Sequence, residues 1–201
     1  ADIVETVVYS PETQKLTYTV IDDTTNTTLE DKKDLASGDS NSEVKPETQT
    51  TYDNIVASYE AKGYELVRKD TLPTKFDADS TTDQNVEIHL VHKIETFKEE
   101  KKVKQTINYV YKDNNPAEPV FPSVERELEF TRENTKDLVT NVVTNGQWTP
   151  ANGTSFGEVV SPTKPGYTAD KAKVEEVNNV TEDTADIVET VVYSPETQKL
   201  T

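Results

Sequence analysis

The same seventeen residues, ADIVETVVYSPETQKLT, stand at positions 1–17 and again at positions 185–201 of this chain. Chance does not produce an identical run of this length, so the chain contains a repeat with a period of 184 residues. A long fixed period is typical of proteins built from tandem copies of one structural unit. We therefore expect one full period plus the first residues of the next, taken from a longer array. The absence of Met favours the same interpretation.

A fainter repeat lies inside this period. LTYTVIDD at Leu16–Asp23 resembles INYVYKDN at Ile107–Asn114, and VEIHL at Val86–Leu90 resembles VETVV at Val188–Val192. These matches predict two related domains of about ninety residues each, which fits the usual length of small domains. The charged stretch Lys93–Lys104 is expected to join them.

Four segments follow from these matches. Residues 1–10 are predicted to be a terminal strand left over from the preceding repeat, either loosely held or paired with the edge of a neighbour. The segments after it are a first domain at 11–97, a second domain at 98–194 and the start of the next repeat at 195–201.

The first domain combines strand and helix patterns. Leu16, Tyr18 and Val20 alternate with Thr residues, and Val86, Ile88 and Leu90 alternate with Glu87 and His89, as in half-buried strands. A short second strand is expected within Asp22–Ser42, and a third begins at Tyr64. Between them an apolar stripe predicts a helix near 51–62, capped by Thr50 or Thr51 and ended by Gly63. This order is that of a β-grasp (ubiquitin-like) fold.

The second domain is predicted to be a more purely β relative of the first. Strands are expected along Val103–Tyr111, along Val124–Thr131 with Leu128 and Phe130 inward, and along Leu138–Val142. Asn145-Gly146 is a typical hairpin-turn sequence. The predicted fold class is thus α+β, mostly β, with two tandem β-grasp type domains in an elongated arrangement.

Charge and composition exclude several function classes. Asp and Glu outnumber Lys and Arg by 38 to 21, a net charge of -17, which disfavours nucleic-acid binding. No run of about twenty apolar residues is present, so membrane insertion is not expected. The absence of Cys removes disulfides, thiolate metal sites and Cys nucleophiles.

The runs TYDNIVASYEAKGYELV, TTDQNVEIHLVHK and QWTPANGTSFGEVVSPTKPGYTADKAKV occur in the order found in one family. With these motifs the chain resembles, over essentially its whole length, the mucus-binding (Mub, MucBP) repeats of lactic-acid bacteria. The resemblance implies β-grasp modules in tandem, secretion, and attachment to the cell wall of a Gram-positive bacterium through signals outside this sequence. It implies no catalytic motif.

Metal sites have little support in the sequence. His89 and His92 lie three residues apart on a strand and point to opposite faces, so His89 is interpreted as a solvated surface histidine beside Glu87. Asp77, Asp79 and Asp83 offer oxygen ligands for calcium. They lack the spacing of an EF-hand, and loop carboxylates that keep the surface hydrated are the favoured interpretation.

Catalytic and sugar-stacking residues are equally sparse. No G-x-S-x-G, phosphate-binding or H-E-x-x-H motif occurs, and the chain is predicted not to be an enzyme. Trp148 is the single Trp. It is the candidate for stacking on a sugar ring, although packing in a core or hairpin is the favoured interpretation.

The predicted function is adhesion without catalysis or cofactor. The resemblance implies a surface repeat, monomeric within its array, that binds host mucin glycoproteins, with avidity supplied by tandem copies. The alternatives are a protein-binding module that recognises immunoglobulin, which would add a strand to an exposed sheet edge, and a passive stalk.

Overall fold

The first sheet forms where apolar and polar residues alternate. The computed structural model describes residues 1–200. In it Leu16 and Val20 of the first strand are fully buried, as the alternation predicts.

The chain divides into two units, here called the first and the second unit. The first consists of Ala1–Glu95 with Lys136–Val143, and the second of Thr96–Thr135 with the chain from Thr144 onward.

The first unit has four strands and one α-helix. In chain order they are β1 (Thr13–Asp22), β2 (Thr27–Asp39), α1 (Pro46–Glu60), β3 (Tyr64–Lys69) and β4 (Gln84–His92). The sheet order is β2-β1-β4-β3, with the two central strands parallel and both outer pairs antiparallel. This is the β-grasp topology expected from the sequence.

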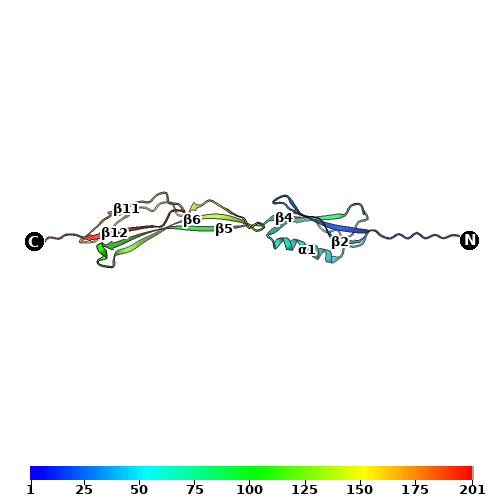
Figure 1. The fold of residues 1–201 in the computed structure, drawn as a ribbon, viewed down its shortest axis with the longest axis horizontal. Coiled ribbons are helices and arrows are strands. Elements are labelled where there is room, and N and C mark those ends of the chain that lie inside the picture. The colour runs from blue at the N-terminus through cyan, green and yellow to red at the C-terminus, as the bar shows by residue number, and fades with distance from the viewer. Residues whose placement is uncertain (201) are drawn as a thin grey trace. The chain divides into compact units, whose positions relative to one another are not determined.

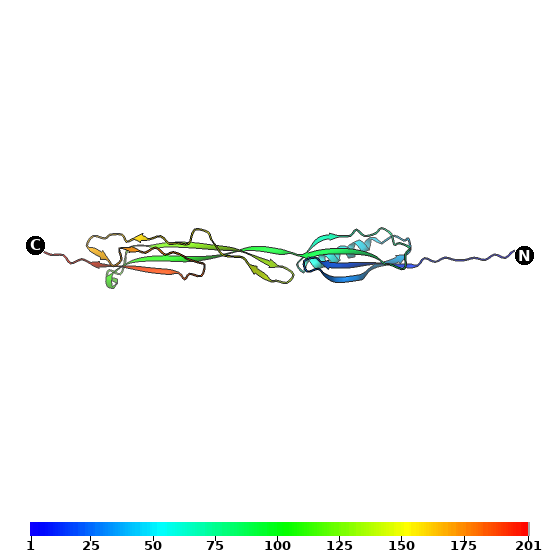
Figure 2. The same ribbon diagram turned by 90° about the horizontal axis from the view of Figure 1, so that it is seen from above.

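Helix α1 covers one face of this sheet (Figure 1). Tyr52 and Val56 of the helix pack with Leu16, Ile88 and Leu90 of the central strands in one buried cluster. The predicted apolar stripe is therefore the face of the helix that enters the core. Figure 2, turned by 90°, shows the strands of the sheet side by side.

The start of the helix was predicted too late. Helix α1 begins at Pro46, with Lys45 as N-cap residue in an extended conformation, and not at a Thr50 or Thr51 cap. Proline suits the first helical position because its fixed φ fits and its missing N–H has no partner there. The end of the helix agrees with the sequence, since Gly63 takes a φ of +100° just beyond it.

The second unit is built almost entirely from strands. Its elements are β5 (Ile94–Tyr111), the 3-10 turn η1 (Lys112–Asn114), β6 (Pro119–Asp137), β7 (Val143–Asn145), β8 (Thr149–Pro150), β9 (Val159–Val160), β10 (Tyr167–Ala169), β11 (Lys173–Val174) and β12 (Ile187–Pro195). The main sheet runs β10-β12-β5-β6-β7, with β8 also paired to β6, while β9 and β11 form a separate pair. As in the first unit, the central strands β5 and β12 are parallel.

Two apolar clusters lie along this sheet. Ile107, Tyr109, Val191 and Tyr193 form one with their neighbours, and Val103, Leu128, Phe130, Phe156 and Val180 form the other. The inward direction predicted for Leu128 and Phe130 is confirmed by exposures of 4% and 3%.

The predictions for residues 138–146 were wrong. Leu138–Thr140 form a turn after β6 and not a strand. The Asn145-Gly146 pair does not form a hairpin, because β7 before it and β8 after it both pair with β6. The amide of Gly146 instead donates to Asn134 Oδ1 at 3.1 Å. Apolar alternation over three residues is too short a signal to separate a strand from a turn.

The expected charged connection at Lys93–Lys104 is mostly strand. Lys93 alone separates β4 from β5, and β5 continues without interruption from Ile94 to Tyr111. Its charged side chains project from a paired strand, so composition alone gave a misleading indication of a linker.

The two copies of the repeated sequence differ in structure. Ile187–Pro195 is β12, in which Val191 and Tyr193 are buried, whereas Ala1–Ser10 forms no strand and is exposed throughout. The match of Val188 with Val86 was also out of register, since Val86 is 4% exposed and Val188 67%. A shift by an odd number of residues moves a strand residue to the other face.

Candidate polar site on the first sheet

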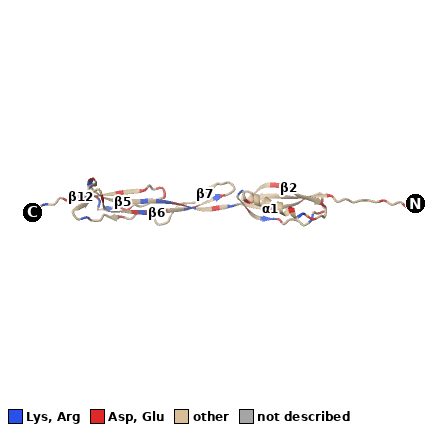
Figure 3. Ribbon diagram, turned by 90° about the horizontal axis from the view of Figure 1, so that it is seen from below, with Lys and Arg blue, Asp and Glu red and all other residues tan. Residues whose placement is uncertain are grey.

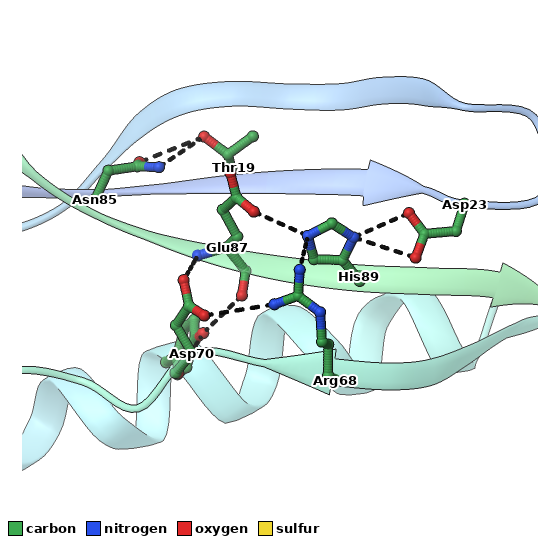
Figure 4. Close-up of polar contacts among 8 residues, drawn as sticks. Thr19, Asp23, Arg68, Asp70, Asn85, Glu87 and His89 are labelled. Carbon is green, nitrogen blue, oxygen red and sulfur yellow. Dashed lines mark hydrogen bonds and ion pairs between the residues drawn. The ribbon is translucent and has the colours of Figure 1, made fainter.

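A polar network covers the face of the first sheet opposite α1. Alternation along β4 buries Ile88 and Leu90 against the helix and turns Glu87 and His89 the other way, as predicted. Arg68 from β3 and Asp23, just beyond β1, reach the same place (Figure 4). Three neighbouring strands thus bring these side chains together.

His89 is the centre of this network. Its Nδ1 lies 2.9 Å from Asp23 Oδ1, and its Nε2 lies 2.9 Å from Glu87 Oε2 and 3.0 Å from an Arg68 nitrogen. The hydrogen bonds to Asp23 and then to Glu87 raise the pKa of the imidazole above its usual 6.5, against smaller opposing effects of burial and Arg68. Its side chain is 12% exposed, so it is less solvated than the sequence suggested.

Asn85 extends the network toward the start of β4. Its side-chain amide contacts two hydroxyl groups, with Thr17 Oγ1 donating to Asn85 Oδ1 at 2.8 Å and Asn85 Nδ2 donating to Thr19 Oγ1 at 3.2 Å. On the β3 side, Arg68 pairs with Asp70, whose other oxygen accepts the Glu87 amide at 2.9 Å. The face therefore presents amide, guanidinium, imidazole and carboxylate groups in fixed positions, suited to hydrogen bonding with a polyhydroxylated or polar ligand.

Trp148 lies in the second unit and packs against the Phe130 cluster. Arg132 stands 4.5 Å and Lys101 5.3 Å from the centroid of its ring. Arg132 is held in turn by Glu99, with a shortest N–O distance of 2.8 Å. Cation–aromatic contacts of this kind stabilise the ring in place. The same cations compete with a sugar ring for its faces.

Of the three acidic residues considered for calcium, Asp77 and Asp79 accept local hydrogen bonds. Asp77 Oδ1 accepts the Asp79 amide at 3.2 Å, and Asp79 Oδ1 accepts the Thr81 amide at 2.9 Å. The Thr81 hydroxyl and amide lower the pKa of Asp79. No group of three or more His, Cys, Asp and Glu side chains able to hold a metal ion occurs in residues 1–200.

Two further features had no clear signal in the sequence. A polar pocket of about 350 Å³ in the second unit is lined by Asn108, Asn114, Glu118, Ser123 and Thr190 among others. His92 is buried and contacts two carboxylates, one of them from Asp137, 45 residues further along the chain. Only the tertiary structure could reveal that pair, because a single histidine gives no sign of a partner so distant.

The charges of the chain are dispersed. Asp and Glu residues occur along both units, interleaved with Lys and Arg (Figure 3). None of the helices in the described part of the chain has the length and apolar character needed to cross a membrane.

Two protein-family models match this chain. A model of the Muc B2-like domain matches residues 94–197, more than half of the chain, and a model of a mucin binding domain matches residues 14–92. The chain belongs to the mucus-binding (Mub/MucBP) repeat family. The resemblance noted in the sequence is thereby confirmed.

Solved structures of Mub and MucBP proteins resemble this Mub/MucBP repeat. The crystal structure of Mub-RV is 31% identical, with 92% of this chain and 100% of that chain covered and a TM-score of 0.67. The type 2 repeat of the mucus binding protein MUB from Lactobacillus reuteri is 26% identical, with 91% and 100% covered and a TM-score of 0.49. The mucin-binding domain of Spr1345 from Streptococcus pneumoniae is 32% identical, with 52% and 99% covered and a TM-score of 0.46. A search of curated protein sequences found no match.

Proposed function

We propose that this chain is a non-enzymatic adhesive repeat that binds the glycans of host mucin glycoproteins. The observation that carries the proposal is the pair of family matches, which together span residues 14–92 and 94–197. We further propose that the parent protein is exposed on the surface of a Gram-positive bacterium and anchored to its cell wall.

The polar face around His89 is the proposed glycan contact. Amide and guanidinium groups can donate hydrogen bonds to sugar hydroxyls, and carboxylates can accept from them. Arg68 offers an exposed cation, with 58% of its side chain accessible. A local cation matters because mucin glycans are commonly anionic and the chain carries a net charge of -17. At physiological salt, charges separated by more than about 8 Å are largely screened, so binding depends on such short-range contacts.

Each single site is expected to bind weakly. The face is open, and its groups already satisfy one another, so a ligand gains little by replacing those bonds. Tandem copies would raise the overall affinity by avidity, without any new contact.

Binding of an immunoglobulin by strand addition has weaker support. Strand β2 is an edge of the first sheet, but its pairing with β1 is interrupted by register shifts, and Lys32 takes a φ of +47°. Bulges and charged residues of this kind protect an edge against a partner strand. A polar face is thus the better supported contact.

The proposal is tested by mucin binding to the immobilised repeat, before and after periodate oxidation of the glycans. Intact mucin is expected to bind and oxidised mucin is not. Undiminished binding of oxidised mucin, or saturable binding of immunoglobulin alone, would contradict a glycan-binding function. Absence of saturable binding to any of these ligands would favour a passive stalk.

Variants then test the proposed face. Arg68→Ala and His89→Ala are expected to weaken mucin binding about fivefold or more, since each removes a polar contact. Lys98→Ala is the matched control, because it removes a cation with 60% of its side chain exposed in the second unit. If Trp148→Ala, or Asn108→Ala in the polar pocket, abolishes binding while Arg68→Ala does not, the contact lies in the second unit.

A further inference from the structure

The turn after β6 belongs to the first unit. Residues Lys136–Val143 group with Ala1–Glu95 and not with the strands that flank them in sequence. The Leu138 amide donates to the carbonyl of Lys93 at 2.9 Å. The chain therefore leaves the first unit after Glu95 and returns to it at this turn, here called the clasp turn.

The turn packs closely against Gly63. A Cβ atom at Gly63 would come within 2.2 Å of the Leu138 carbonyl oxygen, which is far inside van der Waals contact. Only glycine allows this approach, and only glycine takes the φ of +100° at this position without strain. Gly63, just beyond the end of α1, is thus also the residue against which the clasp turn packs.

A buried histidine bridges the turn and the first sheet. His92 Nδ1 lies 2.6 Å from Asp137 Oδ2 in the clasp turn, and His92 Nε2 lies 2.6 Å from Asp22 Oδ2 at the end of β1. The His92 and Asp22 side chains are 6% and 3% exposed, and that of Asp137 is 21% exposed. Two ionised carboxylates can both accept hydrogen bonds from the ring only when the imidazole is doubly protonated.

The carboxylates are themselves fixed by the backbone. Asp22 Oδ1 accepts the Thr24 amide at 2.9 Å, and Asp137 Oδ1 accepts the amides of Val139 and Thr140 at 2.8 and 3.1 Å. Asp137 therefore shapes the turn with one oxygen and attaches it to His92 with the other. Removing the proton from the imidazole would leave one buried carboxylate facing a lone pair.

We propose that Asp22, His92 and Asp137 form a proton-dependent clasp that keeps the Lys136–Val143 turn in place in the first unit while the imidazole is charged and releases it when the imidazole loses its charge. The inference is independent of the ligand that the repeat binds, because none of these side chains belongs to the polar face around His89.

The direction of the pH dependence follows from the groups around His92. Burial lowers the pKa of His92, but the hydrogen bonds to Asp137 and Asp22 outweigh it, so the pKa lies above the usual 6.5. Burial raises the pKa of Asp137, but the bonds from His92, Thr140 and Val139 outweigh it, so this pKa lies below the usual 3.8. The ring centroid of Tyr64 from β3 lies 5.5 Å from that of His92. Burial, then the charges of Asp22 and Asp137, raise the pKa of Tyr64 above its usual 10.0, so it is neutral at acid and neutral pH.

His92 and Asp137 each stabilise the fold over a defined pH range. A raised His92 pKa stabilises the fold fully below pH 6.5, and the contribution is lost as the pH rises through the folded-state value. A lowered Asp137 pKa stabilises it above pH 3.8, and the contribution is lost as the pH falls through the folded-state value. Both contributions are complete between pH 3.8 and pH 6.5, and the clasp opens as the pH rises through the folded-state pKa of His92.

Nuclear magnetic resonance of the full chain tests the clasp. We expect the His92 imidazole to titrate above pH 6.5, and the hydrogen-exchange protection of the Leu138 amide to fall about tenfold as it does so. Protection of the Val191 amide in the second unit should stay constant over the same titration. A His92 pKa at or below 6.5, or Leu138 protection unchanged by deprotonation, would overturn the proposal.

Two variants separate the clasp from a general loss of folding. Asp137→Asn keeps the size of the side chain but removes its charge, and it should lower both the His92 pKa and the protection of Leu138 at pH 6. Asp183→Asn is the control, because its side chain is 79% exposed in the second unit. Equal Leu138 protection in the two variants, with native circular dichroism in both, would also overturn the proposal.

Discussion

Single residues of the first unit make contacts that the sequence pattern predicts only in part. Tyr52 belongs to the predicted apolar stripe of α1, but its hydroxyl also donates to the carbonyl of Asp70 at 2.9 Å. Burial, then the charges of Asp70 and Asp53, raise its pKa to about 12. The residue is thus both a core side chain and an anchor for the loop after β3.

Tyr52→Phe should therefore destabilise the first unit by about 1 kcal/mol, because it removes one buried hydrogen bond and leaves the ring in place. Chemical denaturation followed by circular dichroism measures the change. Tyr9→Phe is the matched control, since Tyr9 is 90% exposed and its substitution should leave the free energy of unfolding unchanged. An equal effect of both substitutions would contradict this account of Tyr52.

Glycines with a similar backbone differ in what surrounds them. Gly63 and Gly153 have φ values of +100° and +97°, but a Cβ at Gly63 meets the Leu138 carbonyl whereas a Cβ at Gly153 meets nothing within 4 Å. Gly153→Ala should cost about 1 kcal/mol for the backbone conformation alone. Gly63→Ala should cost clearly more and should expose the clasp turn. Thermal unfolding of the two variants gives the comparison, and equal losses would show that the turn yields without cost.

At the scale of elements, long alternating patterns were reliable and short signals were not. Strands β1 and β4, β5 from Val103 onward, and β6 around Leu128 and Phe130 form where apolar residues alternate, because one face of each is buried. The strand expected at Leu138–Val142 does not form. Asp137 accepts two backbone amides and closes a turn there, and this turn contacts Lys93 and His92 of the first unit.

Strand β12 and its copy at Ala1–Ser10 permit a controlled test of burial. Val191 of β12 is fully buried, whereas Val7, the same residue in the copy, is 74% exposed. Val191→Ala should destabilise the second unit by about 2 kcal/mol through lost apolar burial and a residual cavity. Val7→Ala should change the free energy of unfolding by less than about 0.5 kcal/mol. Denaturant titration of both variants decides, and similar effects would mean that the copy is ordered in solution.

At the scale of the whole molecule, net charge governs the approach to an anionic ligand. A chain at -17 is repelled by sialylated or sulfated glycans at low salt. Dispersion of the charges over both units means that no single substitution removes this repulsion (Figure 3). Protonation of many carboxylates together does remove it.

Mucin binding should accordingly strengthen at mildly acid pH. Unperturbed Asp and Glu have pKa values of about 3.9 and 4.3, so acidification toward pH 4 neutralises much of the negative charge. Surface plasmon resonance at pH 4 and at pH 7.4, in the same low-salt buffer, measures the effect. Equal affinity at the two pH values would refute a role for long-range repulsion.

The sequence by itself determined the repeat, the family, the alternating strands and the apolar face of α1, because these depend on local spacing alone. Only the tertiary structure decided which segments pair with one another. The copies of ADIVETVVYS have the same β propensity, yet only the second is a strand, because β5 and β10 satisfy its backbone hydrogen bonds and bury Val191 and Tyr193. The first copy has no such neighbours in the described chain, and an isolated strand is not stable in water.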